Sequence, residues 1–247
     1  MPLRLRVAYD GTDFAGFQKQ PHRRTVQGEL ERYLRPLMGP GQVWGASRTD
    51  AGVHARDQVV IWTGSVPLPH DRVALVLNRR LPPDLSIQTV DWVPESFRPI
   101  EDAVAKYYSY RIWQAQTPPW PGTARYVAAL EHPLSWTILR LAAQLLVGRH
   151  DFWAFRSEGS SAKTTVRHVF LSKWTMEEAG SIWRYDIAAD GFLYHMVRRL
   201  VGTMVLCAQS RDLSLIHQGL ENPYAGKVGW VAPAKGLILE HIDYGMD

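Results

Sequence analysis

Apolar and polar residues alternate along several short segments of this chain, a pattern that is typical of half-buried β-strands. The clearest case covers residues 3–9, where Leu3, Leu5 and Val7 alternate with other residues. Alternation, and apolar runs bounded by turn residues, predict further strands. These are expected at 43–45, 58–62, 85–92, 103–114, 165–176, 181–189 and 237–242, with a turn at 177–180 that joins two of them in a hairpin.

Other segments carry apolar residues at helical spacing. Thr25, Asp71 and Ser135 precede three of these segments and are predicted N-caps, because their side-chain oxygens can accept a hydrogen bond from a first-turn N–H group. The predicted helices run from Thr25 to Met38, from after Pro69 to Arg80, from Ser135 to Gly148, and over 192–208 and 213–220.

Both halves of the chain mix helices with strands that are joined partly by hairpins. This order predicts an α+β fold with mostly antiparallel sheets flanked by helices. We place the boundary near residue 100, which gives two halves, 1–100 and 101–247. A chain of 247 residues is long enough to bury a substantial core.

The composition, 46% apolar and 21% charged, is ordinary for a globular protein. No apolar run approaches the roughly 20 residues that a membrane span needs, and the first residues alternate instead of forming a signal-peptide core. The single cysteine, Cys207, excludes an internal disulfide and a cysteine zinc site, and its apolar neighbours predict a buried helix position. We expect a cytoplasmic protein.

The charge balance gives a modest indication of the kind of partner that the protein binds. The chain has 28 basic and 24 acidic residues, and its isoelectric point is about 9.2. Of the basic residues, 22 are arginine, whose planar fork matches phosphate oxygens and stacks on bases. An RNA partner would explain this bias, and so would a GC-rich genome or a hot habitat. Pairs that could form a basic face are Arg23 with Arg24, Arg79 with Arg80, and Arg198 with Arg199.

The segment SRTDAGVH at 47–54 places one carboxylate, that of Asp50, in a predicted turn, with Arg48 two residues before it. An aspartate beside an arginine stays ionised, because the cation favours its charged form. Such a group can act as a nucleophile or a base. The alternative is an aspartate that only caps the turn, with Gly52 supplying a positive backbone angle.

The stretch 45–55 resembles the signature of the tRNA pseudouridine synthase A family, whose members isomerise uridines in the anticodon stem-loop of tRNA. Ser47 stands where a small residue, often glycine, is usual, and Lys106 with Tyr107 stand where two arginines are common. Further motifs of the family follow its order along nearly the whole chain: YDGTDFAGFQ (9–18), TVQGEL (25–30), AKYYSYR (105–111), GRHDF (148–152), GFLYHMVRRLVG (191–202) and APAKGL (232–237).

The resemblance implies two α+β halves related by a pseudo-twofold axis around a central RNA-binding cleft, and a homodimer that binds the anticodon arm of tRNA. Isomerisation breaks the N1–C1′ bond, turns the uracil and joins C5 to C1′, so we expect no metal and no cofactor. Asp50 is the expected catalytic carboxylate. Attack on C1′, attack on C6 and a glycal route all remain open.

Arg198 matches the family's partner for this aspartate, and Tyr108 matches the tyrosine that stacks on the uracil and relays the C5 proton. Tyr110 is the alternative, because it lies on the same side of the strand. Since the target nucleotide must leave its stack, Arg48 is expected to fill the vacated space or hold the phosphate. The remaining expected contacts are Phe192 and Leu193 near the pocket, and Arg199, Arg23, Arg24, Arg79 and Arg80 on the RNA backbone; His54, His150 and Asp151 are expected to tie loops.

Three other functions fit parts of the sequence. The Asp10–Thr12 segment resembles an aspartate-nucleophile phosphatase motif, but Ala8 stands where the nucleophile would be. A non-catalytic RNA-binding module is a second alternative, and it predicts that Asp50 is dispensable. A third is a pseudouridine synthase that acts on another RNA, selected by loops such as 117–122 and 156–163.

Overall fold

The computed structural model describes residues 1–130, 132–159, 162–177 and 181–245. Its contacts divide the chain into unit 1, Met1–Val104 with Ile238–Asp247, and unit 2, Ala105–Leu237. From the sequence, the second half was expected to cover all of 101–247. The last strand instead pairs with a strand of unit 1, which is a long-range contact that no local pattern reveals.

Unit 1 is built on a sheet in which β1 and β3 are central. β1 pairs with β4 on one side and β3 on the other, and the far edge of β3 is shared by β2 and β10. β10 is parallel to β3, and the other pairs are antiparallel. The strands are β1 (Leu3–Tyr9), β2 (Val43–Gly45), β3 (His54–Trp62), β4 (Leu85–Trp92) and β10 (Leu237–Asp243).

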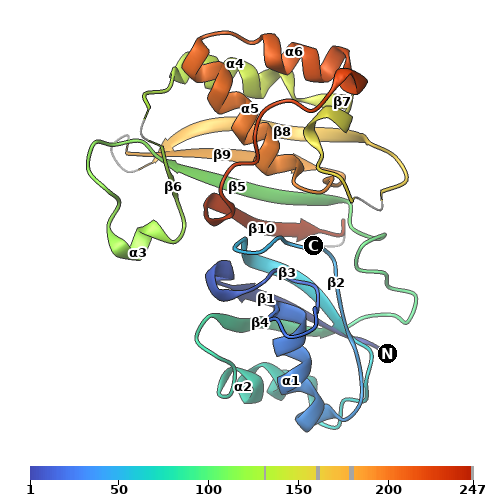
Figure 1. The fold of residues 1–247 in the computed structure, drawn as a ribbon. Helices are drawn as coiled ribbons and strands as arrows, with labels where there is room; N and C mark the ends of the chain where they lie inside the picture. The colour runs from blue at the N-terminus through green and yellow to red at the C-terminus, as the bar shows by residue number, and fades with distance from the viewer. Residues whose placement is uncertain (131, 160–161, 178–180, 246–247) are drawn as a thin grey trace. The chain divides into compact units, whose positions relative to one another are not determined.

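Two helices complete unit 1, α1 (Val26–Met38) packed on β2 and α2 (His70–Asn78) packed on β4 (Figure 1). The predicted cap of α1 is confirmed, because the Thr25 hydroxyl accepts a hydrogen bond from the N–H of Gly28. The predicted cap of α2 is wrong. Pro69 occupies the N-cap position with no side-chain bond, and Asp71 lies inside the first turn.

Unit 2 contains a second sheet, in the order β5–β9–β8–β7, with the short β6 parallel to β5. The helices α4, α5 and α6 gather on one face of this sheet, and α5 packs against both α4 and α6 (Figure 1). The predicted β8–β9 hairpin is confirmed, although residues 178–180 of its turn lie outside the described part of the chain. The strands are β5 (Ala105–Trp113), β6 (Ala128–Ala129), β7 (Gly148–Asp151), β8 (Val166–Glu177) and β9 (Ile182–Ala189), and the helices are α3 (Pro121–Ala124), α4 (Trp136–Leu145), α5 (Met196–Ser210) and α6 (Ser214–Glu221).

The predicted fold class, α+β with mostly antiparallel pairing, is confirmed. Two element boundaries differ from prediction for backbone reasons. α5 starts at Met196 and not at residue 192, because His195 has a φ of 61°, which a right-handed helix cannot contain. Gly148 begins β7 and does not close α4, which ends at Leu145.

Cys207 is fully buried in α5, as predicted. Among the helices of the described ranges, none combines the length and apolar character that crossing a membrane requires.

Candidate active site

The turn that carries Asp50 connects β2 to β3 and rests on the loop after β1. The N–H of Phe17 donates to the Thr49 carbonyl at 3.0 Å, and the N–H of Gly52 donates to the Phe14 carbonyl at 3.3 Å. Gly52 has a φ of +80°, which is the positive angle expected from the sequence. The Asp50 turn is therefore anchored on both sides by the loop that follows β1.

His54, at the start of β3, also holds the loop after β1 in place. Its ring is 2% exposed, and its Nδ1 atom accepts a hydrogen bond from the N–H of Gly11 at 3.0 Å. The expectation that His54 ties loops is confirmed. The motifs at 9–18 and 45–55 are separated in the sequence, but in the fold they form one structural piece around Asp50.

Gln58 on β3 forms hydrogen bonds with Ser47, the residue at which the chain departs from the family pattern. Its fully buried amide accepts from the N–H of Ser47 at 3.1 Å and donates to the Ser47 carbonyl at 2.7 Å. Both bonds use the backbone of Ser47, so they place no demand on the side chain there. The departure at Ser47 leaves this support intact.

Arg48 and Asp50 flank the buried Thr49, and the Arg48 side chain is exposed while that of Asp50 is half-buried. Arg48 also borders a pocket of about 560 Å³ within unit 1, whose lining includes Trp44 and Ile100. Trp44 is 56% exposed, so an aromatic surface is accessible beside this arginine. The turn thus offers a carboxylate and an exposed cation two residues apart.

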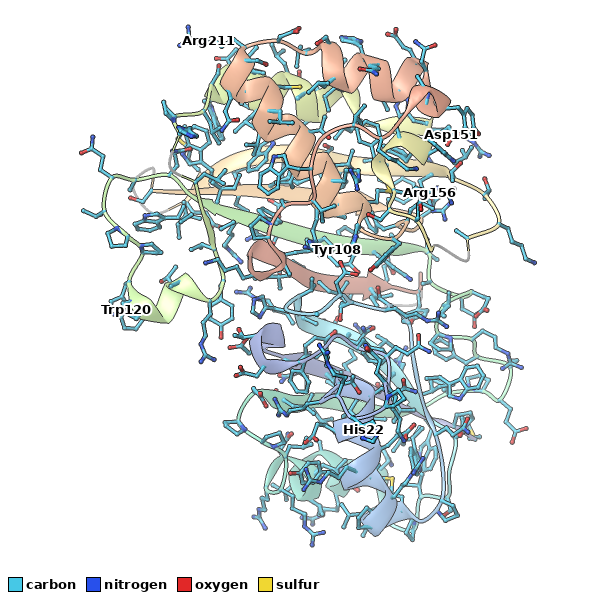
Figure 2. All side chains as sticks on the ribbon, in the orientation of Figure 1. His22, Tyr108, Trp120, Asp151, Arg156 and Arg211 are labelled. Atoms are coloured by element: carbon cyan, nitrogen blue, oxygen red, sulfur yellow. The ribbon has the colours of Figure 1, made fainter. Side chains whose placement is uncertain are left out.

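In unit 2, Tyr108 lies on β5 with only 7% of its surface exposed (Figure 2). Its ring meets that of Phe192 edge to face, with centroids 5.1 Å apart and planes at 84°. Leu193, the next residue, is buried. The structure therefore brings the tyrosine strand and the aromatic–aliphatic pair before α5 together.

Tyr110 is 1% exposed, and its hydroxyl donates to the Pro233 carbonyl at 2.9 Å. Burial raises the pKa of this tyrosine far above its usual range, with the Arg198 charge opposing that rise. Gly236 leaves room for the ring, because a Cβ there would lie 2.7 Å from Tyr110 Cζ. This environment favours the core role for Tyr110 over the RNA contact considered from the sequence.

Arg198 joins α5 to the segment before β10 by two bonds. Its Nε donates to the Ala232 carbonyl at 2.7 Å, and the N–H of Ala232 donates back to the Arg198 carbonyl at 3.1 Å. Gly202 permits this approach, because a Cβ there would lie 2.0 Å from the Trp230 carbonyl oxygen. The motifs at 105–111, 191–202 and 232–237 therefore form a second structural piece, within unit 2.

The predicted arginine pairs have different surroundings. Arg24 makes two bonds to the Asp84 carboxylate, at 2.6 and 2.8 Å, and its bond to Asp84 raises its pKa. Arg199 donates to the Gly229 carbonyl at 3.0 Å and to Ser157 at 3.2 Å, and burial lowers its pKa. Exposed side chains belong to Arg23, Arg79 and Arg80.

His150 and Asp151 tie loops, as expected. His150 Nε2 lies 3.0 Å from the Val147 carbonyl. The Asp151 carboxylate accepts from the N–H of Trp153 at 3.0 Å and from the Tyr224 hydroxyl at 2.6 Å. Within the described ranges, no group of three or more His, Cys, Asp and Glu side chains is arranged to hold a metal ion.

A basic and aromatic cluster around Trp153, which includes Arg156, Lys227 and Tyr224, was not predicted from the sequence. Its members come from segments about 70 residues apart, as the contact between Lys227 and the Trp153 carbonyl shows. No local spacing could have indicated it. A weak signal was available in the mixture of aromatic and basic residues at 152–156.

Asp50 in its turn, Tyr108 on β5 and Arg198 on α5 all lie within motifs that resemble those of a class of RNA-modifying enzymes. The sequence profile of the tRNA pseudouridine synthase family matches residues 6–99 and 142–245. The chain belongs to this family.

Curated relatives match over the full length. The tRNA pseudouridine synthase A of Acetivibrio thermocellus is 38% identical over 245 residues, covering 98% of this chain and 99% of the relative. That of Brevibacillus brevis is 39% identical over 244 residues, with the same coverage. A solved Cbf5-Nop10-Gar1 complex is similar over 82% of this chain and 44% of that chain, with 11% identity and a TM-score of 0.38, and this likeness supports no conclusion about function.

Proposed function

We propose that this protein isomerises uridines in the anticodon stem-loop of tRNA to pseudouridine, with Asp50 as the catalytic carboxylate. The observation that carries the proposal is the Asp50 turn, because two family motifs are anchored to one another by hydrogen bonds around this one residue. Family membership over nearly the whole chain supports the reaction. The anticodon arm as target rests on the resemblance of the motifs.

The reaction balances without any other reactant. The N1–C1′ bond breaks, the uracil turns, C5 bonds to C1′, and the proton on C5 is transferred so that N1 carries a proton in the product. A carboxylate can add to C1′ or C6 and leave again, or it can remove a sugar proton to give a glycal. Each of these routes requires the carboxylate of Asp50 to approach the target nucleotide directly.

The residues of unit 2 supply the remaining roles. Tyr108 presents a ring that Phe192 holds edge to face, and such a ring can stack on a uracil. Arg198 is the proposed partner that orients the catalytic carboxylate. Its bond to Ala232 fixes the first turn of α5 and limits the positions that the guanidinium can reach.

A uridine within a stem-loop must leave its stack before C1′ can be reached, at a cost of a few kcal/mol. Arg48 is exposed beside Asp50, and we assign it to the space left by the extruded nucleotide or to its phosphate. Exposed arginines at positions 23, 79 and 80 are the proposed contacts with the RNA backbone. Backbone contacts of this kind lose affinity steeply as salt concentration rises.

Two further proposals follow from the family. We infer that two copies of the chain form a homodimer that holds one tRNA, which light scattering of the free protein and of its tRNA complex would test. We also infer a cytoplasmic location, because the proposed substrate is tRNA.

The decisive experiment measures tritium release from tRNA that carries [5-³H]uridine, since isomerisation exchanges the C5 hydrogen. Wild type should release tritium and Asp50→Asn should not, while both bind tRNA equally. Equal release by both proteins would exclude Asp50 as the catalytic carboxylate. Retained tRNA binding without release by wild type would favour another RNA substrate or a binding module.

A further inference from the structure

Two cationic side chains from separate segments of unit 2 lie over the ring of Trp153, and a third, that of Arg199, is linked to the segment that follows this ring. The Lys227 ammonium lies 3.4 Å from the centre of this ring, and the Arg156 guanidinium carbon lies 5.6 Å from it. Arg199 is joined to the same group through Ser157, the neighbour of Arg156. We call Arg156, Arg199 and Lys227 the cation cluster.

The backbone that carries the cation cluster is fixed by hydrogen bonds. The N–H of Val228 donates to the Ala154 carbonyl at 3.2 Å, and the N–H of Ser157 donates to the Tyr194 carbonyl at 3.0 Å. Gly229 has a φ of +64° and lies so close to α5 that a Cβ would come within 2.2 Å of the Thr203 hydroxyl. The three cations are therefore held together by the fold.

The cluster has an excess of positive charge. Among the residues that the structure describes, none of its three members forms an ion pair with a carboxylate. Two acidic side chains influence it: Asp151, which already accepts bonds from Trp153 and Tyr224, and the exposed Glu158.

The neighbouring arginine charges contribute to a lowered pKa of Lys227. Burial, followed by the charges of Arg156 and Arg199, lowers the pKa of Lys227, and Glu158 only partly offsets these effects. The Nε atoms of both arginines are also buried without a hydrogen-bond partner in the described structure. Crowded cations repel one another, and an anion with several acceptor oxygens would offset this repulsion.

We propose that the cation cluster binds a backbone phosphate of the substrate RNA. This inference rests on the proposed function, which supplies the RNA. Arginine forks match the two non-bridging oxygens of a phosphodiester, and Lys227 adds a point charge.

The neighbouring aromatic surface favours RNA over a free anion. Tyr224 is 67% exposed, its ring lies 5.4 Å from that of Trp153, and its hydroxyl is held by Asp151. An exposed, fixed ring beside a phosphate site offers a stacking face for a base or a ribose, as in other single-stranded RNA sites. A free phosphate ion would make no use of it.

Arg156 is the main residue tested, because its side chain forms no hydrogen bond among the described residues. Its substitution therefore leaves the backbone hydrogen bonds around the cation cluster intact. Arg156→Gln and Lys227→Gln are compared with Arg140→Gln, which removes an exposed charge on α4. The dissociation constant of full-length protein and tRNA is measured over a salt series. Each cluster variant should weaken binding about tenfold at low salt and reduce the slope of log K against log salt by about one, whereas Arg140→Gln should match wild type.

Arg156→Lys should restore much of the affinity, because it keeps the charge, and this separates a phosphate contact from a packing defect. Affinities and slopes of both cluster variants equal to those of Arg140→Gln would overturn the proposal. So would unchanged tRNA binding combined with stabilisation of wild type, but not of Arg156→Gln, by inorganic phosphate. Tritium release by wild type is scored separately, so a failure of the proposed activity is distinguishable from a failure of this site.

Discussion

A Cβ atom at Gly16 would lie 3.0 Å from the carbonyl oxygen of Thr49, the residue before Asp50. Gly16 also has a φ of +97°, a conformation that side chains other than hydrogen rarely tolerate. The loop after β1 can therefore approach the Asp50 turn only because residue 16 is glycine. This contact sets the position of the proposed catalytic carboxylate from a motif more than thirty residues away.

Gly16→Ala should consequently impair turnover beyond its effect on stability. The added methyl group must push the Thr49 carbonyl, and this displaces Asp50. Gly159→Ala is the matched control, because Gly159 has a φ of +83° but no atom of the described structure within 4 Å of its added Cβ. Both variants should lose about 1 kcal/mol through backbone strain, as measured by urea unfolding. Only Gly16→Ala should lose most of its tritium release, and equal release by the two variants would contradict the argument.

Substitutions of the two tyrosines considered for the catalytic role, Tyr108 and Tyr110, should also differ in whether they affect turnover or stability. Tyr110→Phe removes the partner of the Pro233 carbonyl and should cost about 1 kcal/mol of stability with little effect on turnover. Tyr108→Phe keeps the ring and its contact with Phe192 but removes the hydroxyl proposed to relay the proton. Stability and single-turnover rates of both variants decide between them. A slower chemical step in Tyr110→Phe alone would reverse the assignment.

The acid stability of unit 2 should depend on Glu177, which lies 3.0 Å from Arg111 and 3.2 Å from Arg184. Burial raises the pKa of this carboxyl, but the bonds to both arginines outweigh it and lower the pKa overall. A depressed carboxyl pKa stabilises the fold above the unfolded-state value of about 4.3, and this contribution is lost as the pH falls through the folded-state pKa.

Glu177→Gln should therefore be less stable than wild type at pH 7, and the difference should shrink toward pH 3. Denaturant unfolding at both pH values measures it. A stability difference that stays constant with pH would mean that the charge of Glu177 contributes nothing. Glu101→Gln, at an exposed position, should show no such difference at either pH.

The sequence predicted elements whose signals are local. Alternation identified β1, and a single hydroxyl identified the start of α1. It placed the start of β3 four residues too late. His54 and Ala55 pair with Ile238 and Leu239 at the other end of the chain, and Ala55 also pairs with Tyr9. No local pattern contains these pairings.

The same distinction holds for the site. Asp50 and Arg198 were found through motifs that are contiguous in sequence. The backbone contacts that hold those motifs together, such as His54 with Gly11, became visible only in the fold. Of the cation cluster, only Arg199 was predicted from the sequence, because Arg156 and Lys227 come together only in the fold, around the ring of Trp153.

The pair Arg23 and Arg24 should divide into one RNA contact and one structural residue. Arg24 is held by Asp84 through two bonds and lies 4.1 Å from the centre of the Phe14 ring, so Arg24→Gln should lower stability by about 1 kcal/mol. Arg23 is exposed, and Arg23→Gln should leave stability unchanged and weaken tRNA binding severalfold at low salt. Thermal unfolding and tRNA binding, measured on both variants, test the division. If Arg23→Gln bound tRNA as wild type does, the basic pair would have no role in RNA recognition, because the charge of Arg24 is already neutralised within unit 1.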